Sequence, residues 1–376
     1  MRVTLADPTL ARQAGRFVWL ELNFDRPANR QFFARHRVRF TPSLFVLDPA
    51  DERALACHFG GMPAGELLEF LDQGARGYAR AGGSAADSLL ARGDALLGVG
   101  RVTDAASAYR AALAAASPDW RERETALSQL AWALTSAGEW RACASTAVAE
   151  APRMARGQRF ARVVYAGLAC ANRDSGDAAL AARRTLAPLA AEALGRTDIR
   201  RDDRFLLYGV LMGSAQLRGD TLEVAGWGTR ALDEIDRITP RSQDERTALD
   251  IARIEMVWDR RSAERVIPAL AASERAMPGS DVAAVRLAQA ELAAERYPDA
   301  RAACARGLRR ARGPIVRTWL CELEARAWLG MKQPAAARRA LARARAAAQA
   351  IGTPENRESN LRTIARLMAD VARRAG

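Results

Sequence analysis

The sequence is short of several residue types, and each shortage excludes a class of protein. Lys332 is its single lysine, it has two histidines, and aromatic residues make up 6% of the chain. No apolar run reaches the roughly eighteen residues that a membrane-spanning helix needs, and the N-terminus lacks the apolar segment of a secretory signal. We therefore expect a cytoplasmic protein with no membrane contact.

Cysteine is scarce as well. Five cysteines are spread over the whole chain, an odd number, without a C-x-x-C motif or the short spacing of metal ligands. They are Cys57, Cys143, Cys170, Cys304 and Cys321. This distribution argues against a disulfide framework and against a zinc site. We expect small buried residues instead, with no metal and no cofactor.

The positive charge comes almost entirely from arginine. The net charge is +13 and the isoelectric point is near 10.6. Such enrichment in Arg and Ala is typical of codon bias in a GC-rich genome, and we expect a bacterial source. Most of the excess is local, because residues 296–345 hold thirteen cations against three acids, a net charge of +10.

The first eighty residues alternate between strand and helix patterns. Residues 17–25 form an apolar, β-branched and aromatic run that predicts a buried strand. A helix over 28–36 follows, then strands over 44–48 and 54–59 joined by a hairpin-length connection, and a helix over 65–78.

This order, with Phe40-Thr41-Pro42 before the second strand and Gly60-Gly61 after the third, resembles the C-terminal two-thirds of a thioredoxin-like domain. In that family the proline is cis and its backbone pairs with an extended substrate segment beside the redox dithiol. The resemblance implies that Thr41 and Pro42 form a peptide-contact loop. The family's first strand and its C-x-x-C helix have no counterpart here, so either the true start lies upstream or a degenerate domain docks on the repeats.

Without the dithiol, no residue of this segment is a convincing catalyst. Cys57 falls in a predicted strand, whereas the thiol of this fold is activated at a helix N-terminus. Neither His36 nor His58 has a nucleophile constellation beside it. We predict no catalytic residue in the chain.

Beyond a junction at 79–84, the sequence turns helical throughout. Residues with tetratricopeptide spacing open this part, namely Leu89, Gly93, Leu96, Gly100, Ala105, Tyr109 and Ala112. The resemblance to tetratricopeptide repeats implies a helical solenoid with a partner-binding groove. We predict seven helix pairs and a capping helix over 355–375. The pairs are 85–98 with 102–116, 121–137 with 140–150, 157–174 with 177–193, 203–218 with 221–236, 242–258 with 262–276, 280–294 with 298–311, and 314–330 with 334–350.

Arginines cluster on two of these helices. Arg306, Arg309 and Arg310 share one helix face, and Arg339 and Arg343 are spaced i, i+4. Two interpretations stay open: a solvated face that reflects composition, or a site for an acidic partner, either peptide or nucleic acid. The scarcity of nearby aromatic residues disfavours single-stranded nucleic acid.

The sequence thus predicts a mainly α protein, with a truncated α/β thioredoxin-like domain over 1–80 and an α-α superhelix over 84–376. The function we expect is a non-enzymatic scaffold that holds a protein or peptide partner in the solenoid groove. One alternative is a thiol-disulfide oxidoreductase or isomerase whose C-x-x-C segment lies upstream of this start. A weaker one is a basic nucleic-acid-binding repeat protein.

Overall fold

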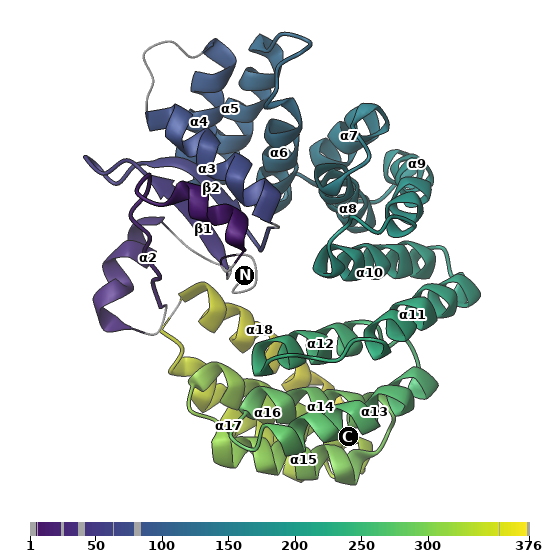
Figure 1. Ribbon diagram of the computed structural model, residues 1–376. Helices are drawn as coiled ribbons and strands as arrows, with labels where there is room; N and C mark the ends of the chain where they lie inside the picture. The colour runs from purple at the N-terminus through teal and green to yellow at the C-terminus, as the bar shows by residue number, and fades with distance from the viewer. Residues whose placement is uncertain are drawn as a thin grey trace. The chain divides into compact units, whose positions relative to one another are not determined.

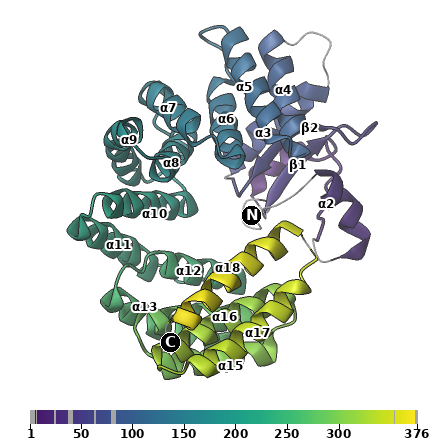
Figure 2. The same cartoon turned by 180° about the vertical axis from the view of Figure 1, so that it is seen from behind.

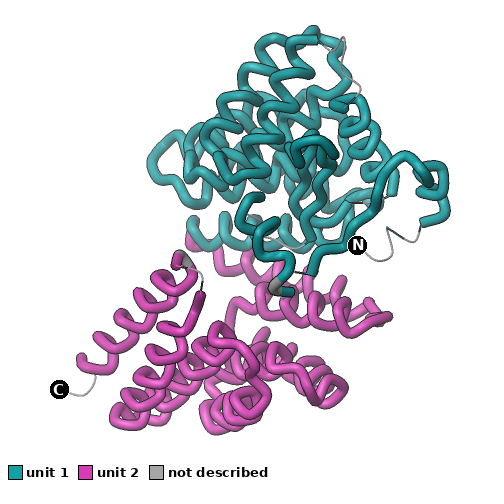
Figure 3. Tube along the Cα trace, turned by 90° about the vertical axis from the view of Figure 1, so that its left-hand side faces the viewer, with its two compact units in different colours: residues 1–217 teal, residues 218–376 magenta. Residues whose placement is uncertain are grey.

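A computed structural model of the chain describes residues 5, 7–23, 26–36, 42–62, 64–78, 84–352 and 354–373. These residues are mainly α-helical, with seventeen α-helices and one two-stranded sheet. They divide into two compact units, Met1–Leu217 and Arg218–Gly376 (Figure 1, Figure 3). Among the described helices, none has the length and apolar character needed to cross a membrane.

The N-terminal part of the first unit is a small α/β element. Strand β1 (Ser43–Leu47) pairs antiparallel with β2 (Ala54–Phe59), and helix α3 (Ala64–Tyr78) covers the sheet. The α3 residues Leu67, Phe70 and Leu71 share a buried cluster with the strands. Two 3-10 turns, η1 (Pro8–Gln13) and η2 (Pro27–Asn29), and helix α2 (Arg30–His36) precede the hairpin. The predicted hairpin and the helix after it are therefore confirmed.

The predicted strand over 17–25 is wrong for the residues that the structure describes. Residues 17–23 form no strand, and residues 24 and 25 lie outside the described part. Val18 and Leu20 are 89% and 76% exposed. An apolar run becomes a strand only when a neighbouring strand pairs with it. In the described part of the chain, the sheet contains β1 and β2 alone.

The rest of the first unit consists of antiparallel helix pairs. Within it α6, α8 and α10 pack side by side, and α7 packs against α9 (Figure 1). The helices are α4 (Ala85–Gly98), α5 (Val102–Ala115), α6 (Arg123–Ala137), α7 (Trp140–Glu150), α8 (Gln158–Arg173), α9 (Asp177–Leu194) and α10 (Arg201–Leu217), with a 3-10 turn η3 (Ala151–Arg153) after α7.

The second unit repeats this arrangement. Helices α12, α14 and α16 pack side by side, with α13, α15 and α17 packed against them. Helix α18 lies against α17 and α16 and buries Ile364 and Val371 there (Figure 2), as expected of a cap. The helices are α11 (Thr221–Asp236), α12 (Gln243–Glu255), α13 (Arg260–Ala276), α14 (Asp281–Ala293), α15 (Tyr297–Arg310), α16 (Pro314–Gly330), α17 (Pro334–Gln349) and α18 (Pro354–Arg373).

Two glycines show why these helices approach so closely. A Cβ at Gly93 of α4 would meet the ring of Tyr109 on α5, and one at Gly330 of α16 would meet the ring of Tyr297 on α15. In both pairs the bare backbone of one helix receives a large ring from its partner.

The predicted helix boundaries agree with the observed ones to within three residues, which confirms the helical-repeat architecture.

Candidate functional site

Pro42, the described half of the predicted peptide-contact loop, lies at the open end of the hairpin. Its carbonyl accepts a hydrogen bond from the backbone N–H of Gly60 at 2.8 Å, just beyond the strand pairing. Gly60 has a φ of 97°, a conformation that favours glycine. Thr41 lies outside the described residues. The start of β1 and the end of β2 are thus joined beside Pro42.

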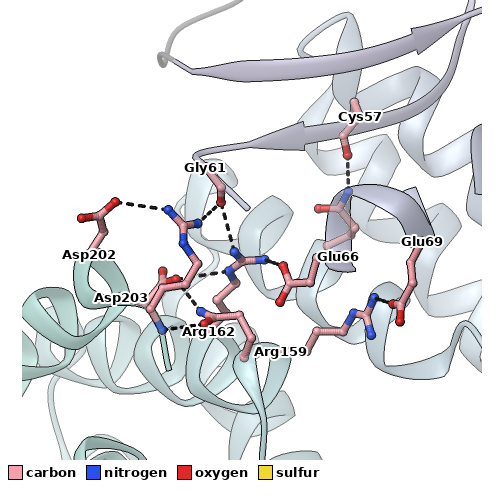
Figure 4. A network of polar contacts seen from close by, with 11 residues as sticks. Cys57, Gly61, Glu66, Glu69, Arg159, Arg162, Asp202 and Asp203 are labelled. Carbon is pink, nitrogen blue, oxygen red and sulfur yellow. Dashed lines mark hydrogen bonds and ion pairs between the residues drawn. The ribbon is translucent and has the colours of Figure 1, made fainter. Parts of the chain in front are cut away.

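A polar network connects this hairpin end and α3 to helix α8 (Figure 4). Arg162 of α8 donates to the Glu66 carboxylate at 3.1 Å and to the Gly61 carbonyl at 3.2 Å. Arg200 donates to the same carbonyl, and Arg159 pairs with Glu69 at 2.5 Å. The side chains of Arg162 and Glu66 are mostly buried, at 17% and 16% exposure. Removing one partner from an ion pair this shielded from water costs more stability than removing one from a surface pair.

Asp203, near the start of α10, belongs to the same network. It lies 3.8 Å from Arg162 and accepts a hydrogen bond from the Gln158 amide, whose oxygen accepts from the backbone N–H of Arg200 at 2.9 Å. Burial raises the pKa of Asp203, while the charges of Arg162 and Arg200 act in the opposite direction. The network therefore continues from α3 through α8 to α10.

A second set of contacts holds β2 and α3 against the first helix pair. Asp94 of α4 is fully buried and accepts hydrogen bonds from the Tyr109 hydroxyl at 2.7 Å and the Gln73 amide of α3 at 2.9 Å. Burial and the Asp94 charge raise the pKa of Tyr109 well above its usual value, so its hydroxyl stays protonated as a donor. Gln129 of α6 donates to the Cys57 carbonyl of β2 at 2.6 Å. The α/β element is therefore packed onto the helices through buried polar contacts.

Burial lowers the pKa of both histidines. Burial, together with nearby arginines such as Arg162, lowers the pKa of His58 to about 3. A general base works best with a pKa near the working pH, so His58 is poorly suited to that role. Burial also lowers the pKa of His36, whose ring lies 4.4 Å from that of Phe32 and 5.4 Å from that of Phe45.

The cysteines require a correction. Cys143 of α7 and Cys170 of α8 form a disulfide, with their Cα atoms 6.1 Å apart, although the sequence predicted no disulfide. The helices approach closely because Gly167 of α8 leaves room for Ala147 of α7. The 27-residue separation gives no sequence signal for such a pair.

The other three cysteines are buried thiols, as predicted. Burial, followed by the Asp94 charge, raises the pKa of Cys57 well above its usual value. Burial is also the main cause that raises the pKa of Cys304 to about 12 and that raises the pKa of Cys321. Because the thiolate is the nucleophile, such thiols are unreactive near neutral pH.

Two of the five predicted partner-binding arginines share one acidic partner inside the second unit. Arg306 and Arg310 of α15 both bind Glu274 of α13, at 2.8 Å and 3.0 Å. The Glu274 side chain is only 7% exposed. Burial alone would raise the pKa of Glu274, but the hydrogen bonds and charges of the two arginines outweigh it and hold the pKa below its usual value. These contacts join α13 to α15.

The remaining predicted arginines are exposed. Arg343 reaches Glu324 of α16 at 2.5 Å while 53% of its side chain stays exposed. Arg309 and Arg339 are exposed and, among the described residues, have no acidic partner within ion-pair distance. Arg338 and Arg345 on α17, beside the predicted pair, are also exposed and have no acidic partner within ion-pair distance among the described residues.

Helix α16 contains a buried carboxyl group that the sequence did not predict. Glu322 is 9% exposed, and burial raises its pKa to about 7, opposed by Arg326. Its Oε1 atom has no hydrogen-bond partner in the described part of the structure. No lone glutamate in a helical repeat is recognisable as buried from sequence, because its burial depends on which helices pack over it.

The described residues offer no group of three or more His, Cys, Asp or Glu side chains that could hold a metal ion. A hollow of about 360 Å³ between η1 and α3 is lined mainly by polar and charged side chains. Arg16 and Asp72, two of its lining residues, pair with each other at 2.9 Å.

Comparison with known proteins does not identify a family. No protein-family model matches the chain, and no curated protein matches it either. Among solved structures, the chain is similar to one described as "TPR2AB-domain:pHSP90-complex of yeast Sti1", at 16% identity and a TM-score of 0.31. The match covers 77% of this chain and 100% of that one. The fold assignment therefore rests on the helix packing described above.

Proposed function

We propose that this chain is a non-enzymatic interaction scaffold whose helical array holds a protein or peptide partner. The observation that carries the proposal is the way charge is distributed in the second unit. The buried Glu274 is matched by Arg306 and Arg310, whereas Arg309 and Arg339 are exposed without an acidic partner among the described residues. Like charges on one surface repel unless something acidic lies against them, so such a surface favours a partner.

Two surfaces are candidates for holding this partner. One is the groove that the first helices of the pairs are expected to line. The other is the outer surface of α15 and α17. We favour the second surface, because its exposed arginines specify the chemistry of a partner.

We also propose that the N-terminal element is a thioredoxin-like module without the dithiol, and that Thr41 and Pro42 contact an extended segment. In support, Pro42 directly precedes β1, whose outer edge has no strand partner in the described part of the chain. An edge strand offers free backbone groups to an extended peptide. This module should not reduce a disulfide, and clear turnover in an insulin-reduction assay would contradict the proposal.

A peptide library displayed on phage tests the scaffold function. We expect selection against the folded, full-length chain to enrich peptides that bind at one site per chain, with dissociation constants of about 1–100 µM, a free energy of roughly 5–8 kcal/mol. Calorimetry on the enriched peptides would measure both quantities. If no peptide binds the folded chain better than an unselected one, the scaffold function is wrong.

A further inference from the structure

We propose that six arginines on α15 and α17 form a docking surface for an extended acidic peptide segment. We call this surface the arginine face: Arg301, Arg309, Arg338, Arg339, Arg343 and Arg345. The proposal rests on the scaffold function and specifies the partner's chemistry. It concerns the second unit alone.

The two helices lie on the same side of α16. The guanidinium of Arg301 on α15 stacks over the ring of Trp328 at 4.7 Å, and Arg343 on α17 pairs with Glu324 at 2.5 Å. Trp328 and Glu324 are one turn apart on α16, and the indole N–H of Trp328 donates to the Glu324 carboxylate at 3.4 Å. Contacts from Arg301 and Arg343 therefore meet on one strip of α16.

The arginines stand at two levels along these helices. Helix α15 runs antiparallel to α16, because Tyr297 at its start packs at Gly330 and Gly307 near its end packs at Leu320. Helix α17 begins a few residues after α16 ends, so α15 and α17 start at the same end. Near that end lie Arg301, Arg338 and Arg339, and further along lie Arg309, Arg343 and Arg345. At 1.5 Å per residue, Arg301 and Arg309 are about 12 Å apart along α15, and Arg338 and Arg345 are about 10 Å apart along α17.

Almost nothing on these helices neutralises the arginines. Both helices are described in full, and together they carry eight arginines and one acid, Asp299. Arg306 and Arg310 pair with Glu274, and Arg343 pairs with Glu324. On α17 the other exposed positions are mainly alanines, which project too little to shield the guanidinium groups.

An extended acidic peptide matches this spacing. A strand advances about 3.3 Å per residue, so side chains at i and i+4 point to the same side about 13 Å apart. The planar guanidinium group pairs with a carboxylate through two parallel hydrogen bonds. Nucleic acid fits less well, because the two helices carry a single aromatic residue, Tyr297, whose ring packs at Gly330, and the Trp328 ring of α16 is covered by Arg301.

The test uses a fluorescein-labelled octapeptide, Gly-Glu-Glu-Gly-Gly-Glu-Glu-Gly, and its Gln-for-Glu counterpart, with fluorescence anisotropy on the full chain. The face variant combines Arg309→Glu, Arg338→Glu and Arg345→Glu. The matched control combines Arg92→Glu, Arg184→Glu and Arg366→Glu, exposed arginines on α4, α9 and α18. Both variants change the net charge equally, so they separate the local surface from overall charge. Circular dichroism checks that each stays folded, and Gln at the same three face positions replaces Glu if the face variant unfolds.

We expect the Glu peptide to bind, the Gln peptide not to bind, and binding to weaken as salt rises. The face variant should bind at least tenfold more weakly, and the control variant within about threefold of the unmodified chain. Equal weakening in both variants would overturn the proposal, as would tighter, face-dependent binding of a labelled oligothymidylate. If phage-selected peptides bind the face variant as well as the unmodified chain, the arginine face is wrong while the scaffold function stands.

Discussion

Replacing Glu274 by Gln tests whether Arg306 and Arg310 hold the second unit together. The substitution keeps the shape of the side chain and removes the charge that accepts three hydrogen bonds from Arg306 and one from Arg310. Removing one partner of a fully buried ion pair costs about 3–5 kcal/mol, and exposed pairs contribute about 0.2–1 kcal/mol. Glu274 is buried but the two arginines are partly exposed. We therefore expect a loss of about 2 kcal/mol in the free energy of unfolding.

Urea unfolding followed by circular dichroism measures this loss. With a slope of about 2 kcal/mol per molar, the midpoint of the second unit should fall by about 1 M. In the Glu274→Gln background, Arg306→Gln should cost little more, because its partner charge is already gone. Equal midpoints for the original chain and Glu274→Gln would refute the structural role of this contact.

The difference in unfolding free energy between the original chain and Glu274→Gln should depend on pH. The folded-state pKa of Glu274 is held below its usual 4.5, so its contribution is fully present above pH 4.5 and is lost as the pH falls through the lower folded-state value. Gln cannot be protonated in this range. The stability difference should therefore be constant above pH 4.5 and shrink at more acidic pH, and a difference that grows there would contradict the assignment.

Three further predictions concern the first unit, with a control substitution, Gly226→Ala, in the second. Gly93→Ala should destabilise it by about 1–3 kcal/mol, because the new Cβ meets the Tyr109 ring, whereas Gly226→Ala, with open space around it, should cost nothing in thermal unfolding. Tyr109→Phe removes a donor from the buried Asp94 carboxylate and should cost about 1–3 kcal/mol in urea; an unchanged midpoint would show that this hydrogen bond is dispensable. Thiol titration in denaturant should find three reactive cysteines without reductant and five with it, and five in both would show that Cys143 and Cys170 are not bonded.

The helical array was predictable because its signals are local. Small residues such as Gly93 recur where helices cross, and glycines such as Gly138 and Gly176 adopt a positive φ at the turns between helices. Each helix boundary depends on a few consecutive residues, so the sequence predicted it closely. The α/β part was harder, because a strand depends on its neighbours: residues 17–23 have a strand pattern but no strand partner among the described residues.

The candidate site was predictable only in part for the same reason. The i, i+4 spacing identified Arg306 and Arg310 as neighbours but could not show that Glu274, over thirty residues earlier, lies against both. It also could not show that the neighbouring Arg338 and Arg345 are exposed, because their exposure depends on how α17 packs on α16. The disulfide between Cys143 and Cys170 likewise depends on a helix crossing that no sequence spacing encodes.

Hydrogen-exchange mass spectrometry with and without the octapeptide tests the central claim most directly, namely that the chain binds acidic segments through α15 and α17. We expect the peptide to slow exchange in fragments that cover Tyr297–Arg310 and Pro334–Gln349, and to leave α4 to α10 unchanged. Protection confined to other helices, or no protection at peptide concentrations that saturate the anisotropy signal, would contradict it.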